Sequence, residues 1–113
     1  MASNAAAVRP IEARSVVEQV TTASDIVVSV DTFRPDVAAP CIDAGAAVIN
    51  DTTGLHDPEL ADLVAARGAT LVITHSLALP HQHHRRPQYN DVVTEVKAFL
   101  TERIQLALSL IHI

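Results

Sequence analysis

Aromatic residues, cysteine and long apolar runs are all scarce in this sequence. Phe, Tyr and Trp make up 3% of the residues although 49% are hydrophobic, so the core must be built from Ala, Val, Ile and Leu, as is usual in α/β proteins. The only cysteine, Cys41, has no partner for an internal disulfide, which favours a reducing compartment. No run reaches the roughly 18 apolar residues of a transmembrane helix, and residues 1–10 lack the apolar stretch of a secretory signal. We therefore expect a cytoplasmic protein with no membrane partner.

Basic residues are also few. The chain has 8 Lys and Arg against 13 Asp and Glu, a net charge of −5. Nucleic acids are bound through basic patches, so no nucleic-acid partner is expected. No Gly-rich loop of the dinucleotide or Walker type follows any predicted strand, which weakens a nucleotide-binding interpretation. A length of 113 residues is enough for one small domain.

Three short β-branched apolar runs are present, and each ends in polar side chains. They predict strands at about residues 26–31, 47–50 and 70–75. Nearly continuous apolar runs of this length are typical of parallel strands that are buried on both faces. Helical patterns between them give the order β-α-β-α-β-loop-α, which predicts a parallel sheet with right-handed crossovers. An open doubly wound sheet and part of a (β/α)₈ barrel both fit; a complete barrel needs roughly 250 residues.

Local signals predict where the connecting helices begin and end. Pro10 begins a helix over about residues 11–22, and Pro35 begins one that ends at Gly45. Pro40 is a defect in the second helix that costs about 3 kcal/mol or a kink. Asp57 caps a third helix and Asn90 a long fourth. The inner face of the fourth is predicted to comprise Val93, Val96, Leu100, Ile104 and Ala107.

Two strand-end residues are the first candidates for a binding site, because both architectures bind ligands at the carboxyl ends of their strands. Asp31 could accept hydrogen bonds from a ring N–H and an exocyclic amine, or cap the turn into the next helix. Asn50 offers both a donor and an acceptor, which suits a heterocycle, but it could equally tie down its own loop. The neighbouring Asp51 is predicted to be structural.

Histidine and cysteine give weaker signals. His75 could be a catalytic base or a metal ligand, although a histidine at a strand end is more often a hydrogen-bonded structural residue. Cys41 falls on a predicted helix face, which favours a packed thiol. The loop after His75 has a histidine spacing that matches no common zinc motif, which favours a solvated basic loop. Its histidine and arginine residues are His81, His83, His84, Arg85 and Arg86.

Four motifs resemble successive motifs of the dihydropteroate synthase family. They are Ser29-Val30-Asp31-Thr32, the segment from Asp43-Ala44-Gly45-Ala46 to Ile49-Asn50-Asp51, Asp57-Pro58-Glu59, and Pro87-Gln88-Tyr89-Asn90-Asp91-Val92-Val93 with Glu95-Val96. They occur in the family's order and close to its spacing, and the resemblance covers most of residues 26–106. The pterin-binding domain of corrinoid methyltransferases shares the fold and the strand-end pattern.

The resemblance implies a (β/α)₈ barrel enzyme that joins a dihydropterin pyrophosphate to p-aminobenzoate, with Mg²⁺, to make dihydropteroate for folate synthesis. Residues 11–108 would be an internal fragment of that barrel, between a loose lead-in at residues 1–10 and an atypical tail at residues 109–113. Asp31 and Asn50 match the family's pterin-binding Asp and Asn on the third and fourth strands. Thr74 and His75 are further candidates for the pterin site.

Several parts of the family pattern do not occur in this sequence. The Asn-Val-Thr-Pro-Asp-Ser loop for metal and phosphate is absent, so no metal ligand is expected in this chain. The later strands with an Asp, a Lys and an Arg-x-His are also absent. Thr74-His75-Ser76 stands where the family usually has Met-His-Met. We expect the isolated chain to be inactive, and the family's common homodimer is an expectation for a full-length parent only. A non-catalytic pterin-binding homologue and a corrinoid methyltransferase domain are the alternative functions.

Overall fold

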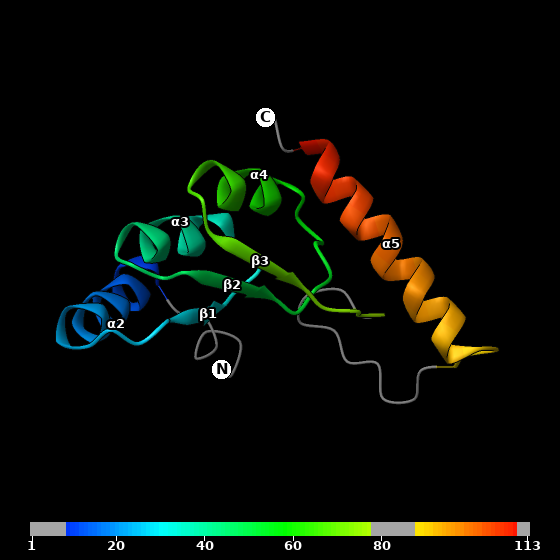
Figure 1. Cartoon of the computed structure of the whole chain (residues 1–113), viewed down its shortest axis with the longest axis horizontal. Helices are drawn as coiled ribbons and strands as arrows, with labels where there is room; N and C mark the ends of the chain where they lie inside the picture. The colour runs from blue at the N-terminus through cyan, green and yellow to red at the C-terminus, as the bar shows by residue number, and fades with distance from the viewer. Residues whose placement is uncertain (1–8, 78–87, 111–113) are drawn as a thin grey trace.

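The computed structural model describes residues 9–77 and 88–110, in which helices and strands alternate. The helices are α2 (Pro10–Ala23), α3 (Pro35–Asp43), α4 (Glu59–Ala66) and α5 (Val92–Leu110), and the strands are β1 (Ser29–Asp31), β2 (Val48–Asp51) and β3 (Thr70–Ile73) (Figure 1). The strands form one parallel sheet in the order β1-β2-β3. The predicted order of elements and the parallel sheet are therefore confirmed.

Strand register divides the side chains of the sheet into two faces. Ser29, Val48 and Thr70 are register partners, and so are Asp31, Asn50 and Val72. These two rows share one face, because partners in a parallel sheet point to the same side and side chains alternate along a strand. The row of Val30, Ile49 and Leu71 lies on the opposite face.

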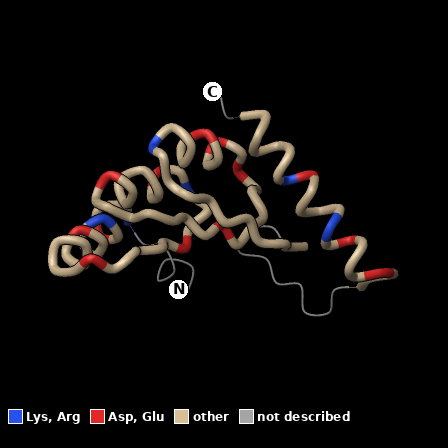
Figure 2. The backbone as a smooth tube through the Cα atoms, viewed as in Figure 1, with Lys and Arg blue, Asp and Glu red and all other residues tan. Residues whose placement is uncertain are grey.

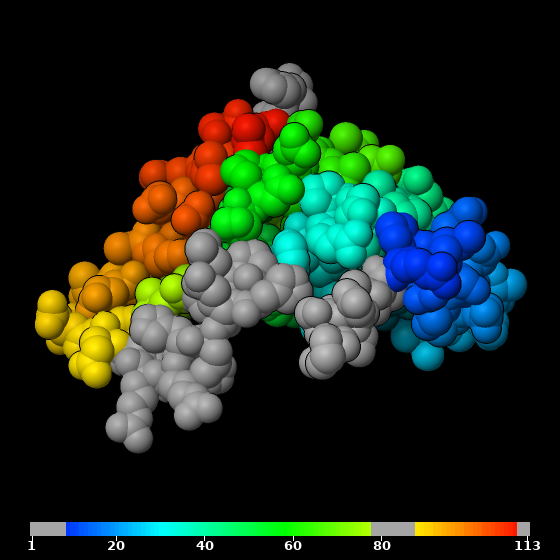
Figure 3. All heavy atoms as spheres, turned by 180° about the vertical axis from the view of Figure 1, so that it is seen from behind, coloured from blue at the N-terminus to red at the C-terminus, as the bar shows by residue number. Residues whose placement is uncertain are grey.

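All the described helices pack on the face that carries Val30, Ile49 and Leu71. One cluster joins Ile49 to buried side chains of α3, α4 and α5, with Val30, Leu71 and Ile73 packed against it. A second cluster joins Val17 of α2 to α3, with Val28 and Val30 packed against it. Figure 1 shows the helices along one side of the sheet, and Figure 3 shows the segments following one another across the molecule in chain order. A doubly wound sheet has helices on both faces, whereas a barrel has them all outside, so the structure favours part of a barrel.

The strands are shorter and more exposed than predicted. β1 begins at Ser29, not at residue 26, and Val27 is 72% exposed. Burial on both faces is wrong for the described chain, because the face with Asp31, Asn50 and Val72 has no helix or strand packed over it. Only Ile49 and Asp51 of β2 are fully buried among the strand residues. We refer below to the face of Ser29, Asp31, Val48, Asn50, Thr70 and Val72 as the open face.

Helices α2, α3 and α4 begin close to their predicted starts. α3 runs through Pro40 without ending, and the N–H of Ala44 donates to the carbonyl oxygen of Pro40 at 3.0 Å. The Asp57 carboxylate accepts from the N–H of Glu59 at 3.0 Å and so helps to start α4. Between α3 and α4, Arg67 Nε donates to Asp43 Oδ1 at 3.0 Å. Charged positions of both signs are spread over the helices (Figure 2).

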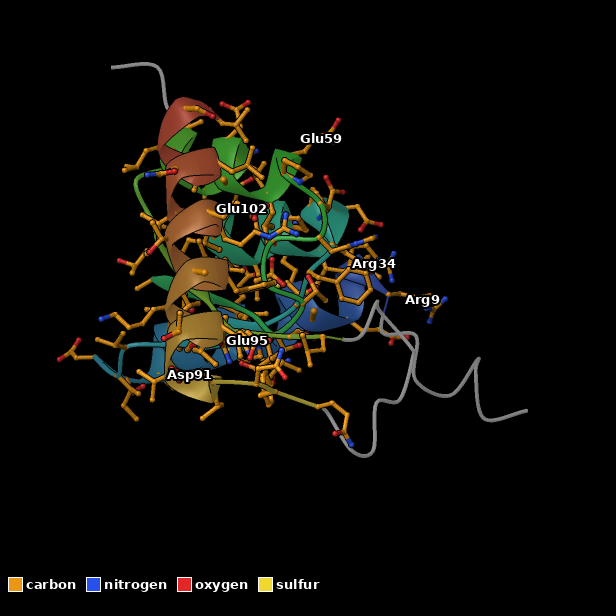
Figure 4. All side chains as sticks on the ribbon, turned by 90° about the vertical axis from the view of Figure 1, so that its right-hand side faces the viewer. Arg9, Arg34, Glu59, Asp91, Glu95 and Glu102 are labelled. Atoms are coloured by element: carbon orange, nitrogen blue, oxygen red, sulfur yellow. The ribbon has the colours of Figure 1, made fainter. Side chains whose placement is uncertain are left out.

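The start of α5 differs from the prediction that Asn90 is the cap. The Asp91 carboxylate accepts from the N–H of Thr94 at 3.3 Å and from its hydroxyl at 3.0 Å. The Glu95 carboxylate in turn accepts from the backbone N–H groups of Asn90 and Asp91, at 2.8 and 2.9 Å. Figure 4 labels Asp91 and Glu95 at this end of the helix. Asp91 is therefore the capping side chain, as an acid that satisfies unpaired N–H groups of the first turn.

The predicted inner face of α5 is only partly correct. Ala107 is buried, but Val93 and Ile104 are 64% and 49% exposed. Leu106 and Leu110 pack against the core instead. Since α5 continues to Leu110, Ser109 and Leu110 of the predicted tail belong to the helix. Three predicted segments lie outside the described residues: the rest of the tail, residues 1–8 of the lead-in and residues 78–87 of the basic loop. Within the described part, no helix is long and apolar enough to cross a bilayer.

Candidate functional site

Asp31 and Asn50 lie side by side at the carboxyl ends of β1 and β2. They are register partners, and the Asn50 side-chain amide donates from Nδ2 to Asp31 Oδ1 at 3.1 Å. On the far side of Asn50, the Thr74 hydroxyl, just after β3, lies 3.5 Å from Asn50 Oδ1, at the long limit of a hydrogen bond. The three strand ends therefore present one connected row of polar groups on the open face, which we call the strand-end row.

The strand-end row can bind a planar heterocycle by its edge. Asp31 is exposed and Asn50 is half-buried, so a ligand can reach both. An ionised carboxylate accepts hydrogen bonds only, while a carboxamide offers two N–H donors and one acceptor oxygen. Together they match a ring edge that carries N–H groups next to a carbonyl or ring nitrogen. The capping role considered for Asp31 is filled by Thr32, whose hydroxyl accepts from the N–H of Arg34 at 3.1 Å.

Backbone hydrogen bonds hold the strand ends at a fixed spacing. The N–H of Thr32 donates to the carbonyl oxygen of Asn50 at 3.2 Å, and the N–H of Thr74 donates to that of Asp51 at 3.1 Å. Both bonds continue the parallel ladder one step beyond the strands. The side chains of the strand-end row are thus carried by regular, paired backbone, which limits their movement relative to one another.

Asp51 points to the opposite face and has a structural role, as predicted. Its side chain is fully buried. Oδ1 accepts from the N–H of Thr53 at 2.8 Å and from its hydroxyl at 2.6 Å, and Oδ2 accepts from the N–H of Leu55 at 3.0 Å. These bonds shape the β2–α4 loop, in which Gly54 and Leu55 both have positive φ angles, +68° and +65°.

His75 packs among aromatic rings on the α5 side of β3. Its ring centroid lies 4.9 Å from that of Phe99 in an edge-to-face arrangement and 5.9 Å from that of Tyr89. The structure thus gives His75 a packing role and places Thr74 in the strand-end row. The sequence interpretation missed Phe99, which is not on the predicted inner face of α5. No local pattern marks Phe99, one of only 3 aromatic residues in the chain, because its contact with His75 depends on the path of α5.

A metal site is not found among the described residues. Nowhere in residues 9–77 and 88–110 do three or more His, Cys, Asp or Glu side chains gather. The Asp31 carboxylate, the acid of the strand-end row, is bonded to the Asn50 amide. The described residues therefore do not fit a Mg²⁺ ion, and His81, His83 and His84 lie outside them.

Cys41 is a packed thiol, as its place on a helix face predicts. It is fully buried in the cluster of Val17, Val37 and Ala46. Burial raises the pKa of the Cys41 thiol, which disfavours the nucleophilic thiolate.

Comparison with known sequences gives one consistent family. The family model described as "Pterin binding enzyme" matches residues 7–110. The chain is 47% identical over 83 residues to a probable bifunctional folylpolyglutamate synthase/dihydropteroate synthase of Haloferax volcanii, covering 74% of this chain and 10% of that protein. It is 39% identical over 89 residues to the dihydropteroate synthase of Mycobacterium leprae, covering 77% of this chain and 31% of that protein. The chain thus spans less than a third of these relatives.

Solved structures agree with the sequence comparison. The dihydropteroate synthase of Stenotrophomonas maltophilia superposes with a TM-score of 0.81 and 36% identity, over 86% of this chain and 37% of that one. That of Thermus thermophilus gives a TM-score of 0.77 and 39% identity, over 86% of this chain, in complexes with 4-aminobenzoate and with 6HMPPP, a pterin pyrophosphate; the chain covers 38% and 39% of the two. These similarities confirm the barrel architecture for the described elements.

Proposed function

The chain belongs to the pterin binding enzyme family, and we propose that it forms the pterin-holding part of a dihydropteroate synthase. Such an enzyme condenses a dihydropterin pyrophosphate with p-aminobenzoate and releases pyrophosphate. The observation that carries the proposal is the side-chain hydrogen bond from Asn50 to Asp31 on the open face. A barrel interior is the face opposite its helices, so this pair lies where a barrel would enclose a ligand.

The strand-end row would bind and orient the pterin. The Asp31 carboxylate accepts from N–H groups on the ring edge, and Asn50 can donate to one ring atom while accepting from another. Exchange of the Asn50–Asp31 bond for bonds to the ligand keeps both side chains satisfied, which limits the cost of desolvation. The ligands of the Thermus thermophilus structures, 4-aminobenzoate and 6HMPPP, support these two substrates.

The expulsion of pyrophosphate is not assigned to residues of this chain. Mg²⁺, which the resemblance implies, would stabilise the negative charge of the departing pyrophosphate, but the described residues offer no set of ligands for it. We therefore propose that the isolated chain makes no dihydropteroate. Formation of dihydropteroate by the purified 113-residue chain from 6HMPPP and 4-aminobenzoate would contradict this.

A segment exchange tests the proposed function directly. Residues 9–110 replace the matching segment of the Stenotrophomonas maltophilia synthase, and dihydropteroate formation is measured. We expect the chimera to be active, and Asp31→Asn to weaken 6HMPPP binding about tenfold or more, because a hydrogen bond to a charged group contributes roughly 1.5–3 kcal/mol. Asp25→Asn, an exposed acid before β1, is the matched control. An Asp31→Asn chimera with unchanged affinity for 6HMPPP removes Asp31 from the site.

A pterin-binding protein without synthase activity is the second candidate. It is favoured by Thr74-His75-Ser76, where the family usually has Met-His-Met, and by the contact of Thr74 with Asn50. The same chimera separates the two functions. A chimera that binds 6HMPPP but forms no dihydropteroate supports the second candidate, and exchange of Thr74 and Ser76 for Met should then restore the reaction.

We also propose that the protein is located in the cytoplasm. The only cysteine, Cys41, is a buried free thiol, and a protein with no disulfide is compatible with a reducing compartment. Fractionation of cells that express the natural protein, followed by detection with an antibody, checks the location.

A further inference from the structure

We propose that Phe99 of α5 is a positioning residue for the strand-end row. Its ring lies where the β2–α4 loop, the end of β3 and α5 meet. Through these contacts, docking of α5 fixes the backbone on which Thr74 and Asn50 are carried. The consequence for pterin binding rests on the proposed function, whereas the positioning itself does not.

The first support is the close approach of Phe99 to Gly54. A Cβ atom on Gly54 would overlap Cζ of the Phe99 ring and would lie 2.8 Å from the carbonyl oxygen of Thr74. Gly54 is buried and has a φ of +68°, a conformation that glycine adopts readily. The ring, the loop and the end of β3 are therefore packed against one another without room for a methyl group.

The second support is that this loop is tied rigidly to β2. The buried carboxylate of Asp51 accepts from the N–H groups of Thr53 and Leu55. Leu55 has a φ of +65°, which is uncommon for a residue other than glycine and persists where surrounding contacts impose it. Because Asp51 directly follows Asn50, displacement of the loop would be transmitted to the Asn50 backbone.

The third support is that the ring itself is held from two sides. The edge-to-face contact with His75 has a centroid distance of 4.9 Å, a geometry that aromatic pairs prefer. The guanidinium carbon of Arg103, one helical turn later, lies 5.3 Å from the Phe99 ring centroid, within the range of a cation–π contact. His75 is the residue after Thr74, so its ring couples α5 to the backbone of the strand-end row.

Backbone amide hydrogen exchange in the 113-residue chain tests the positioning. Phe99→Leu keeps an apolar side chain but removes the ring. We expect the amides of Thr74 and Leu55, which both donate to Asp51, to exchange about tenfold faster in this variant, since local opening sets their protection. The amide of Thr32, which donates to Asn50 on the other side of β2, should change much less.

Two variants control for a general loss of stability. Phe99→Tyr keeps the ring and should restore slow exchange at Thr74 and Leu55. Val96→Ala removes a half-buried side chain from the same helix and should leave both amides unchanged. Equal acceleration of all three reporter amides in Phe99→Leu, or the same acceleration in Val96→Ala, would overturn the proposal.

The synthase chimera connects the positioning to the ligand. In it, Phe99→Leu should raise the Kd for 6HMPPP about tenfold, and Phe99→Tyr should restore it. An unchanged Kd in Phe99→Leu would overturn the link between Phe99 and the pterin site. A parent chimera that binds no 6HMPPP would instead contradict the proposed function, and the exchange experiment on the chain would still decide whether Phe99 positions the strand ends.

Discussion

Two acids at the ends of adjacent strands, Asp31 of β1 and Asp51 of β2, show how strand alternation separates binding from stability. Asp51 is buried beneath the helices, and its carboxylate accepts three hydrogen bonds from its own loop. Asp31 is exposed on the open face, and within the described residues its side chain accepts a hydrogen bond only from the Asn50 amide. A side chain that is fully occupied shapes the fold, whereas one that is exposed beside a second polar group is available to a ligand.

Asp51→Ala should destabilise the chain strongly. Removal of the carboxylate leaves the buried N–H of Leu55 and the half-buried N–H of Thr53 without their acceptor, and we expect a loss of about 3 kcal/mol. Urea unfolding followed by circular dichroism measures it. Asp62→Ala, an exposed acid on α4, is the matched control and should lie within about 0.5 kcal/mol of the parent. Equal unfolding midpoints for the two variants would show that the Asp51 bonds contribute little.

At the scale of elements, helix starts were the most predictable feature. Pro10, Pro35 and Asp57 act within one turn, so neighbouring residues alone decide their effect. The predicted capping residue of α5 was wrong because the two adjacent residues Asn90 and Asp91 are both good caps. The position of Glu95 decides between them. The predicted inner face of α5 was partly wrong because that face depends on what packs against the helix, and Ile104 and Val93 remain 49% and 64% exposed.

Asp91→Ala should fray the first turn of α5, and Asn90→Ala should not. The hydrogen bonds from Thr94 lower the pKa of Asp91 below its usual 3.8. A carboxyl with a lowered folded-state pKa stabilises the fold above pH 3.8 and loses that contribution as the pH falls through the folded-state pKa. Thermal unfolding by circular dichroism at neutral and at low pH measures the effect. The difference in melting temperature between Asp91→Ala and the parent should therefore shrink at low pH, and a constant difference would contradict the assignment of Asp91 as the cap.

At the scale of the molecule, the sequence predicted the sheet but not its exposure. Continuous apolar runs indicate strands that are covered on both faces in a complete protein, and they cannot show whether the covering elements belong to the same stretch of chain. The structure shows helices on one face only and two sheet edges, β1 and β3, within the described residues. The strand-end row was predictable because its members follow the apolar runs directly, whereas the Phe99 contact depends on the path of α5 and was not.

The open face should cause the isolated chain to associate. Val72 on this face is 43% exposed, and Val27, just before β1, is 72% exposed; unpaired edges next to apolar side chains favour pairing with another chain. Val72→Lys should shift sedimentation toward the monomer at a given concentration. Ala66→Lys, an exposed position on α4, adds the same charge away from the open face and should leave association unchanged. A parent chain that is monomeric at all concentrations would contradict this.

The position of Asp31 and Asn50 on the open face has a thermodynamic consequence. If the remaining strands of a synthase barrel cover this face, the pterin is held between the two parts and binds only when they are joined. A ligand that binds one state of an equilibrium stabilises that state by RT ln(1 + [L]/Kd), about 2.7 kcal/mol at a concentration 100 times Kd. Under the proposed function, the pterin would then stabilise the joined barrel relative to its separated parts.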